Sequence, residues 1–189
     1  TSDRSVTRPG PGLPVDARPA MVQAMACERD PRVLDSALLD RVSAEARNSP
    51  RGRRNFNLHL ADGDPCHRLM NAIEPGSYVA PHRHLDAAKD ETIVVLRGRL
   101  IVVFFDDEGR ETSRVTLAAG GDLFGVDVPH GTFHTLWALD PGTVFFESKA
   151  GPYLPMAEAE RALWAPAEGN AGAADWLRRL AGGASLGEA

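Results

Sequence analysis

The sequence predicts an all-β domain with short helices at both ends. About eight short apolar segments follow one another at regular spacing over roughly 100 residues. Clusters of glycine, proline and aspartate separate these segments, as turns between strands require. No segment long enough to form a helical crossover between parallel strands interrupts them. A closed β-barrel or a β-sandwich is therefore the predicted architecture.

The bulk composition is that of one globular domain with an appendage. The chain has 189 residues, of which 43% are hydrophobic. Its net charge of −5 is spread without a block of like charges, so the electrostatic signature of nucleic-acid binding is missing. The sequence has neither the ~18 apolar residues of a membrane span nor the apolar run of a secretion signal. We therefore expect a cytoplasmic protein whose partner is a small molecule, not a nucleic acid or a membrane.

The N-terminal region divides into an arm and a helix. Residues 1–33 are dense in proline and glycine with poor apolar periodicity, which predicts a flexible arm. Residues 34–50 are expected to form a short amphipathic helix that Asp35 caps and that Asn48 and Pro50 end. The two cysteines of the chain form no C-x-x-C motif and are expected to be free thiols.

The predicted β domain spans residues 51–150. From Arg54 the apolar period changes from about 3.6 to about 2 residues, which is typical of strands. Asp106–Gly109 and Asp140–Gly142 are expected to form tight turns. Residues 151–189 return to a helical pattern, in MAEAERALWA and AGAADWLRRLA. The expected strands are NFNLHL, HRLMNAI, ETIVVLRG, RLIVVFFD, RETSRVTL, FGVDVP, FHTLWAL and TVFFESK.

Four side chains have the pattern of a metal site. His82 and His84 alternate along an expected strand and would point to the same face. Glu91 opens the next apolar strand, and His134 follows a tight turn in the segment PHGTFH. Three imidazoles and one carboxylate suit one divalent transition metal ion, such as Fe, Ni, Mn, Co or Zn. A lone H-x-H on a solvated strand is the alternative, and the joint pattern favours the metal site.

Residues 76–98, GSYVAPHRHLDAAKDETIVVLRG, resemble the first signature motif of the cupin superfamily, and residues 129–134, PHGTFH, resemble the core of the second. This resemblance implies a β-barrel of the jelly-roll type. Two departures appear. Six residues separate the second histidine from the glutamate, where the general motif has about three or four, and Ala138 stands where the second motif often has asparagine. The ligands that the resemblance implies are His82, His84, Glu91 and His134.

The longer spacer resembles a narrower group, the cupin-fold metalloproteins of the WbuC family. The segments SPRGRRNFNLH, HRLMNAIEPGSY, FESKAGPY and WAP are similar to this group as well. The resemblance implies a metal-binding cupin, and the occurrence of some members near surface-polysaccharide gene clusters hints at sugars. Cupins commonly pair, so a homodimer is also implied.

Three further side chains are candidates for catalysis. Tyr78 shares the expected strand face of the two histidines and would line the cavity, or else it is a packing aromatic. His59 shares a polar face with Asn55, which is either a pocket face or a solvated one. Lys149 shares a face with Glu147, where an ion pair with a neighbouring strand is the alternative.

The sequence leaves three functions open. The first is a metal-dependent isomerase or epimerase that acts on a small polar molecule such as a sugar derivative, with Tyr78, His59 or Lys149 as the base. The second is an Fe(II)-dependent dioxygenase. The third is a non-enzymatic protein that binds or senses a small ligand through the metal. The ligand set serves all three, so whether the chain is an enzyme stays open.

Overall fold

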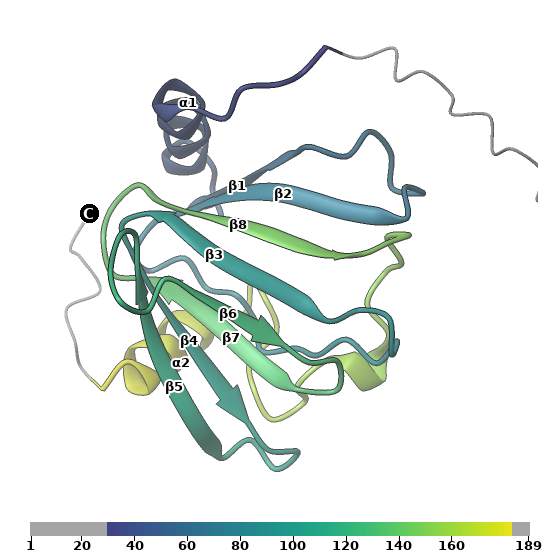
Figure 1. Cartoon of the computed structure of the whole chain (residues 1–189). Coiled ribbons are helices and arrows are strands. Elements are labelled where there is room, and N and C mark those ends of the chain that lie inside the picture. The colour runs from purple at the N-terminus through teal and green to yellow at the C-terminus, as the bar shows by residue number, and fades with distance from the viewer. Residues whose placement is uncertain (1–29, 183–189) are drawn as a thin grey trace, which may run out of the picture. The chain divides into compact units, whose positions relative to one another are not determined.

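The computed structural model of the chain describes residues 30–182 (Figure 1). The flexible arm predicted over residues 1–33 lies almost entirely outside the described residues. All elements belong to one unit that begins at Leu34. In chain order they are α1 (Ser36–Arg47), β1 (Arg53–Asn57), β2 (Cys66–Ile73), β3 (Glu91–Arg97), β4 (Arg99–Phe105), β5 (Glu111–Ala118), β6 (Gly125–Val128), β7 (Phe133–Ala138), β8 (Thr143–Ala150), the 3-10 helix η1 (Glu158–Glu160) and α2 (Ala173–Leu180).

Two antiparallel sheets make up the domain, which confirms the all-β fold class. One sheet has the strand order β1-β2-β8-β3-β6 and the other has the order β5-β4-β7. Strands distant in the sequence are neighbours in both sheets, as in a jelly roll. No strand ladder among residues 30–182 joins the two sheets, so the jelly roll is an open pair of sheets and not a closed barrel.

The main core lies between the facing sides of the two sheets. Alternate side chains of each strand point inward, as the period of two predicts. Ile93 and Val95 of β3 meet Leu100 and Val102 of β4 in one buried cluster. Full burial of a side chain of this size contributes about 1.5–3 kcal/mol. The apolar alternation thus fixes which face of each strand points inward. Polar side chains at the same alternate positions point inward as well.

Helix α1 covers the outer face of the five-stranded sheet. The Asp35 carboxylate accepts a hydrogen bond of 2.9 Å from the Leu38 backbone N–H and caps the first turn. Leu38 and Val42 are buried against Met70 and Val144 of the sheet. The helix lies within the range that the sequence predicts for it.

The C-terminal segment differs from its predicted form. The helix expected over residues 156–165 is replaced by the short η1, because the backbone here pairs with another segment. The Arg83 N–H donates to the Glu160 carbonyl at 2.9 Å, and the Ala162 N–H donates to the Pro81 carbonyl at 3.2 Å. Helix α2, in contrast, lies within the expected AGAADWLRRLA, and Leu177 packs beside the buried Trp137 of the three-stranded sheet. Among residues 30–182, no helix has the length and apolar character to cross a bilayer.

The turn between β3 and β4 requires a glycine. Gly98 has a φ of 73°, in the left-handed region, and a Cβ atom there would collide with the Thr143 hydroxyl. Thr143 is buried, and its hydroxyl donates a 2.7 Å hydrogen bond to the Asp140 carbonyl in the turn between β7 and β8. The two turns therefore pack against each other at one end of the sheets.

Candidate metal centre

His82 and His84 lie in an extended segment, not in the strand that the sequence predicts. Between β2 and β3 only His82 makes bridge pairings, one of them with His134 of β7. The His82 N–H donates to the His134 carbonyl at 3.0 Å, and the His134 N–H donates to the His82 carbonyl at 2.9 Å. This pair of backbone bonds holds two histidines, far apart in the sequence, beside each other.

The glutamate returns to the histidines across the loop at residues 85–90. Glu91 is the first residue of β3, and its Oε2 lies 3.0 Å from Nε2 of His84. Ligand atoms of His82, His84 and Glu91 all lie within 4.8 Å of one another. The six-residue spacer therefore brings the carboxylate beside the two imidazoles.

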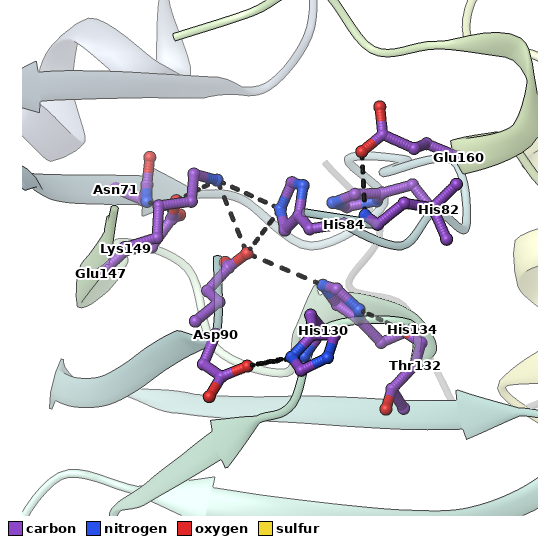
Figure 2. Close-up of polar contacts among 12 residues, drawn as sticks. Asn71, His82, His84, Asp90, His130, Thr132, His134, Glu147, Lys149 and Glu160 are labelled. Carbon is purple, nitrogen blue, oxygen red and sulfur yellow. Dashed lines mark hydrogen bonds and ion pairs between the residues drawn. The ribbon is translucent and has the colours of Figure 1, made fainter. Parts of the chain in front are cut away.

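His134 completes the cluster from the opposite sheet (Figure 2). Its Nε2 lies 3.9 Å from Oε2 of Glu91. Its ring centroid is 4.6 Å from that of His82 and 6.3 Å from that of His84. The four side chains that the sequence selects are thus brought together, with His134 farther from His84 than from His82.

Backbone carbonyls fix the tautomers of two imidazoles. The Nδ1 atom of His82 lies 3.0 Å from the Ala80 carbonyl oxygen, and Nδ1 of His134 lies 2.9 Å from the Thr132 carbonyl oxygen. A carbonyl oxygen only accepts hydrogen bonds, so both Nδ1 atoms carry the proton. Both Nε2 atoms keep a lone pair, which is the arrangement that a metal-ligating histidine needs.

Burial sets the charges of the cluster. Burial, reinforced by the neighbouring His134, lowers the pKa of His82 to about 3, so the imidazole is neutral at physiological pH. Burial also lowers the pKa of His134. For Glu91 burial alone would raise the pKa, but the Lys149 ammonium and the hydrogen bond with His84 outweigh it and lower the pKa below its usual range. Neutral imidazoles beside an ionised carboxylate are the protonation states in which these groups bind a metal.

A second polar network adjoins the cluster. The Lys149 ammonium lies 2.7 Å from Oε1 of Glu147 and 3.5 Å from Oε2 of Glu91. Burial opposes the charge of Lys149, but the two carboxylates raise its pKa above the ordinary value. The amide of Asn71 donates to Oε2 of Glu147 at 2.7 Å. Burial, together with the charge of Glu91, raises the pKa of Glu147.

The donor set fits a divalent transition metal ion. Three nitrogen donors and one carboxylate suit Fe, Mn, Co, Ni or Zn, whereas calcium and magnesium prefer more oxygen ligands. The free Nε2 lone pairs of His82 and His134 and the ionised Glu91 are the structural features that agree with this chemistry.

A cavity of about 300 Å³ ends at this cluster. His82, Glu91 and His134 are among its lining residues. Its polar wall comes from inward-facing residues of β1, β2 and β8, and an apolar wall lies beside it. The polar lining includes Arg53, Asn55, Asn71, Glu147 and Lys149, and the apolar lining includes Ile73, Val79, Leu136 and Phe145.

The three candidate catalytic residues lie in different places. Lys149 lines the cavity and also pairs with Glu91 of the neighbouring strand. Tyr78 is not among the lining residues of this cavity, because the segment before His82 is not a strand and does not keep strand alternation. Its hydroxyl donates to the Pro166 carbonyl at 2.7 Å, and its ring lies edge-on to Trp176. Burial, followed by the charge of a nearby carboxylate, raises the pKa of Tyr78 to about 12.

His59 also lies outside the lining of this cavity. Strand β1 ends at Asn57, and the His59 ring stacks on the His67 ring with centroids 4.0 Å apart. The shared polar face that the sequence predicts is kept only as far as β1 extends, where Asn55 lines the cavity. The end of the strand therefore separates His59 from the cluster.

Sequence reasoning did not single out Asn71 and Arg53 as cavity residues. Asn71 interrupts the apolar alternation of β2 between Leu69 and Ile73, and a polar residue at an inward position was the available signal. For Arg53 no such signal existed, because β1 begins with two consecutive arginines, Arg53 and Arg54, and nothing in the sequence distinguishes them.

Comparisons with known proteins give similarity at the level of the fold. A family described as a domain of unknown function, DUF6016, matches residues 34–117. No curated protein matches the chain. Similar solved structures include KdgF from Halomonas sp., with a TM-score of 0.44 and 20% identity over 56% of this chain and 84% of that chain. A conserved protein of unknown function from Streptococcus pyogenes has a TM-score of 0.45 and 12% identity, over 67% and 92%.

A variant of oxalate decarboxylase from Bacillus subtilis has a TM-score of 0.42 and 20% identity, over 54% of this chain and 26% of that chain. KdgF, oxalate decarboxylase and the similar oxalate oxidase are cupin-fold proteins. The narrower resemblance to the WbuC family stays a prediction.

Proposed function

We propose that the protein binds one divalent transition metal ion per chain and uses it as an enzyme that isomerises or epimerises a small polar molecule, such as a sugar derivative. The ligands would be His82, His84, Glu91 and His134. The observation that carries this proposal is the convergence of these four side chains, three of which line a polar cavity.

The size and lining of the cavity support a small polar substrate. A volume of about 300 Å³ lies at the lower limit for small-molecule sites. Asn55 and Asn71 offer amide groups to a hydroxylated molecule, whereas Ile73 and Phe145 supply an apolar wall. A monosaccharide-sized molecule presents both hydroxyl groups and an apolar ring face.

The chain supplies a candidate acid–base group in Glu147. A bound metal ion would act as a Lewis acid on a substrate oxygen. Glu147 is buried in the cavity lining, and burial, together with the charge of Glu91, raises its pKa, which is the direction that favours a general acid–base group. Asn71 donates to one carboxylate oxygen of Glu147 and orients it. Glu147 would take a proton from the substrate carbon and return it at the same or a neighbouring carbon.

We propose a different role for Lys149 from that of the base which the sequence predicts. Its pKa is raised by Glu91 and Glu147, so the ammonium holds its proton and is a poor base. We assign Lys149 to charge balance and to positioning of the Glu147 carboxylate.

The experiment that tests this function follows proton exchange and oxygen consumption together. The protein is loaded with Fe(II), Mn(II) or Zn(II) and incubated with a panel of aldoses and ketoses in deuterated buffer. We expect deuterium at a substrate carbon without oxygen uptake, and loss of this exchange in Glu147→Gln with metal content unchanged. Oxygen uptake with iron alone would instead establish a dioxygenase. If neither signal appears, the protein is a ligand-binding or sensing protein.

The homodimer implied by the sequence resemblance also stays a prediction. Size-exclusion chromatography with light scattering tests it.

A further inference from the structure

We propose that Arg51 and Arg53 form an anion subsite at the entrance of the cavity, and that the substrate is a sugar acid whose carboxylate binds there in place of Glu168. This inference rests on the proposed function and adds the chemical class of the substrate. It starts from a carboxylate of the protein itself, which these two arginines hold.

The Glu168 carboxylate lies between two guanidinium groups. Its Oε1 is 2.5 Å from Nε of Arg51, and Nη2 of Arg51 donates to its Oε2 at 3.1 Å. Nη2 of Arg53 lies 2.6 Å from the same Oε2. Two arginines on one carboxylate is the geometry by which proteins recognise carboxylate and phosphate ligands.

Arg53 is held in place independently of Glu168. Its Nη1 donates to the Tyr78 carbonyl at 2.7 Å and lies 3.3 Å from the Ser77 hydroxyl. Its side chain is only 17% exposed. The guanidinium group therefore keeps its position when the carboxylate beside it is exchanged, as a preorganised site requires.

The two arginines line both the cavity and a second, outer groove. Arg51 and Arg53 line the 300 Å³ cavity that ends at the metal cluster, and they also line an outer groove of about 950 Å³. Glu168 lines the groove and is not among the lining residues of the cavity. The internal carboxylate thus reaches the arginines from the groove, and a substrate in the cavity would reach the same arginines from within.

Exposure decides which partner of this ion pair is exchangeable. The Glu168 side chain is 39% exposed, more than twice the exposure of Arg53. Glu168 is therefore the more solvated partner, and on release its carboxylate returns to water to which it is already partly exposed. Arg53, in contrast, would remain buried beside the cavity with its charge unbalanced, which favours a replacement anion.

The charge of the cavity also favours an anion. Arg51, Arg53, Arg54 and Lys149 line it on the positive side, and Glu91 and Glu147 line it on the negative side. A divalent ion bound at the inner end would add to the positive side. A substrate with hydroxyl oxygens at one end and a carboxylate at the other would match both ends of the cavity.

The test measures binding of a sugar acid and of its neutral parent. D-glucuronate, D-glucose and D-glucose 6-phosphate are titrated calorimetrically into the metal-loaded full chain. We expect glucuronate to bind at least about tenfold more tightly than glucose, because only glucuronate carries a carboxylate for the arginine pair.

Two variants move the affinity in opposite directions. Glu168→Gln should tighten glucuronate binding about three- to tenfold, because it removes the internal competitor. Arg53→Met should weaken it about tenfold or more. Glucose binding should change less than twofold in both. Asp140→Asn is the matched control. Asp140 also forms a bidentate ion pair with an arginine, Arg99, but it lines neither the cavity nor the outer groove.

Several results would overturn the subsite. The first is equal affinity for glucuronate and glucose, and the second is tighter binding of glucose 6-phosphate than of glucuronate. The third is a Glu168→Gln variant whose affinity for glucuronate equals that of Asp140→Asn. Because Arg53 also supports the Tyr78 carbonyl, Glu168→Gln provides the test that does not depend on the stability of the Arg53 variant.

Two further measurements distinguish failure of the proposed function from failure of the subsite. Metal content measured in every variant reports on the histidine cluster, and glucuronate titrated into metal-free protein reports on the subsite of Arg51 and Arg53. A chain that takes up no metal but binds glucuronate in an Arg53-dependent way would remove the proposed enzyme and keep the subsite.

Discussion

The Lys149 ammonium lies 2.7 Å from the Glu147 carboxylate on the same face of β8, at the edge of the histidine cluster. The same ammonium lies 3.5 Å from Glu91 of the neighbouring strand β3. One cation therefore balances two buried carboxylates, and it links the candidate acid–base group with a candidate metal ligand.

Removal of this cation should destabilise the metal-free protein. Lys149→Met leaves Glu91 and Glu147 buried without their counter-ion, and we expect the free energy of unfolding to fall by about 3 kcal/mol. Urea denaturation at neutral pH measures it. The double variant Lys149→Met with Glu147→Gln should regain part of the loss, because one of the two uncompensated charges is gone. Equal stabilities of the single and double variants would contradict the charge-balance role.

Loss of His134 should lower metal binding. His134→Ala removes an imidazole whose Nε2 lies 3.9 Å from Glu91, and we expect metal content to fall roughly tenfold or more. Elemental analysis after dialysis against limiting metal measures this. His67→Ala is the matched control, because His67 is a buried histidine that lines no part of the cavity. Equal metal content in the two variants would reject His134 as a ligand.

The loss of stability at high pH should depend in part on Tyr78. The folded protein raises the pKa of Tyr78 to about 12, whereas the unfolded chain releases this proton near the ordinary tyrosine pKa of 10.0. Above pH 10 the unfolded chain therefore binds fewer protons, so this contribution to stability is complete below pH 10 and is lost as the pH approaches 12. Tyr78→Phe should lack this contribution.

Urea denaturation at a series of pH values from 9 to 11 checks this. Wild type should be more stable than Tyr78→Phe by about 1 kcal/mol at pH 9, from the hydrogen bond with the Pro166 carbonyl, and the difference should shrink as the pH rises. Tyr153→Phe, at an exposed position, is the control. A difference that stays constant with pH would contradict the burial of the Tyr78 hydroxyl.

The turn at Gly98 should tolerate no side chain. Gly98→Ala combines a left-handed backbone, at about 1–2 kcal/mol, with a collision against Thr143, so we expect a loss of about 3 kcal/mol. Gly120 has a similar φ of 71°, but a Cβ atom there would meet nothing within 4 Å. Gly120→Ala should therefore show only the backbone part of the loss. Thermal or urea unfolding of the two variants separates the two effects.

Local patterns were sufficient for much of the fold. The inward apolar residues of β3 and β4 follow the period of two, and the cap at Asp35 follows from its side-chain chemistry. The predicted helix over residues 156–165 was wrong in most of its length. Its helical pattern is real, but the backbone there bonds to residues 81–83, and no pattern within a segment reveals such a partner.

The sequence by itself determined which side chains have metal-ligand chemistry and that the chain forms antiparallel strands, because residue type and alternation are local properties. Only the tertiary structure decided that His134 meets His82 through a pair of backbone bonds, that Tyr78 turns away, and that Glu168 sits between two arginines. Contacts of this kind join residues that are distant in the sequence. Their geometry is set by how the two sheets and the C-terminal segment pack, not by the residues on either side of them.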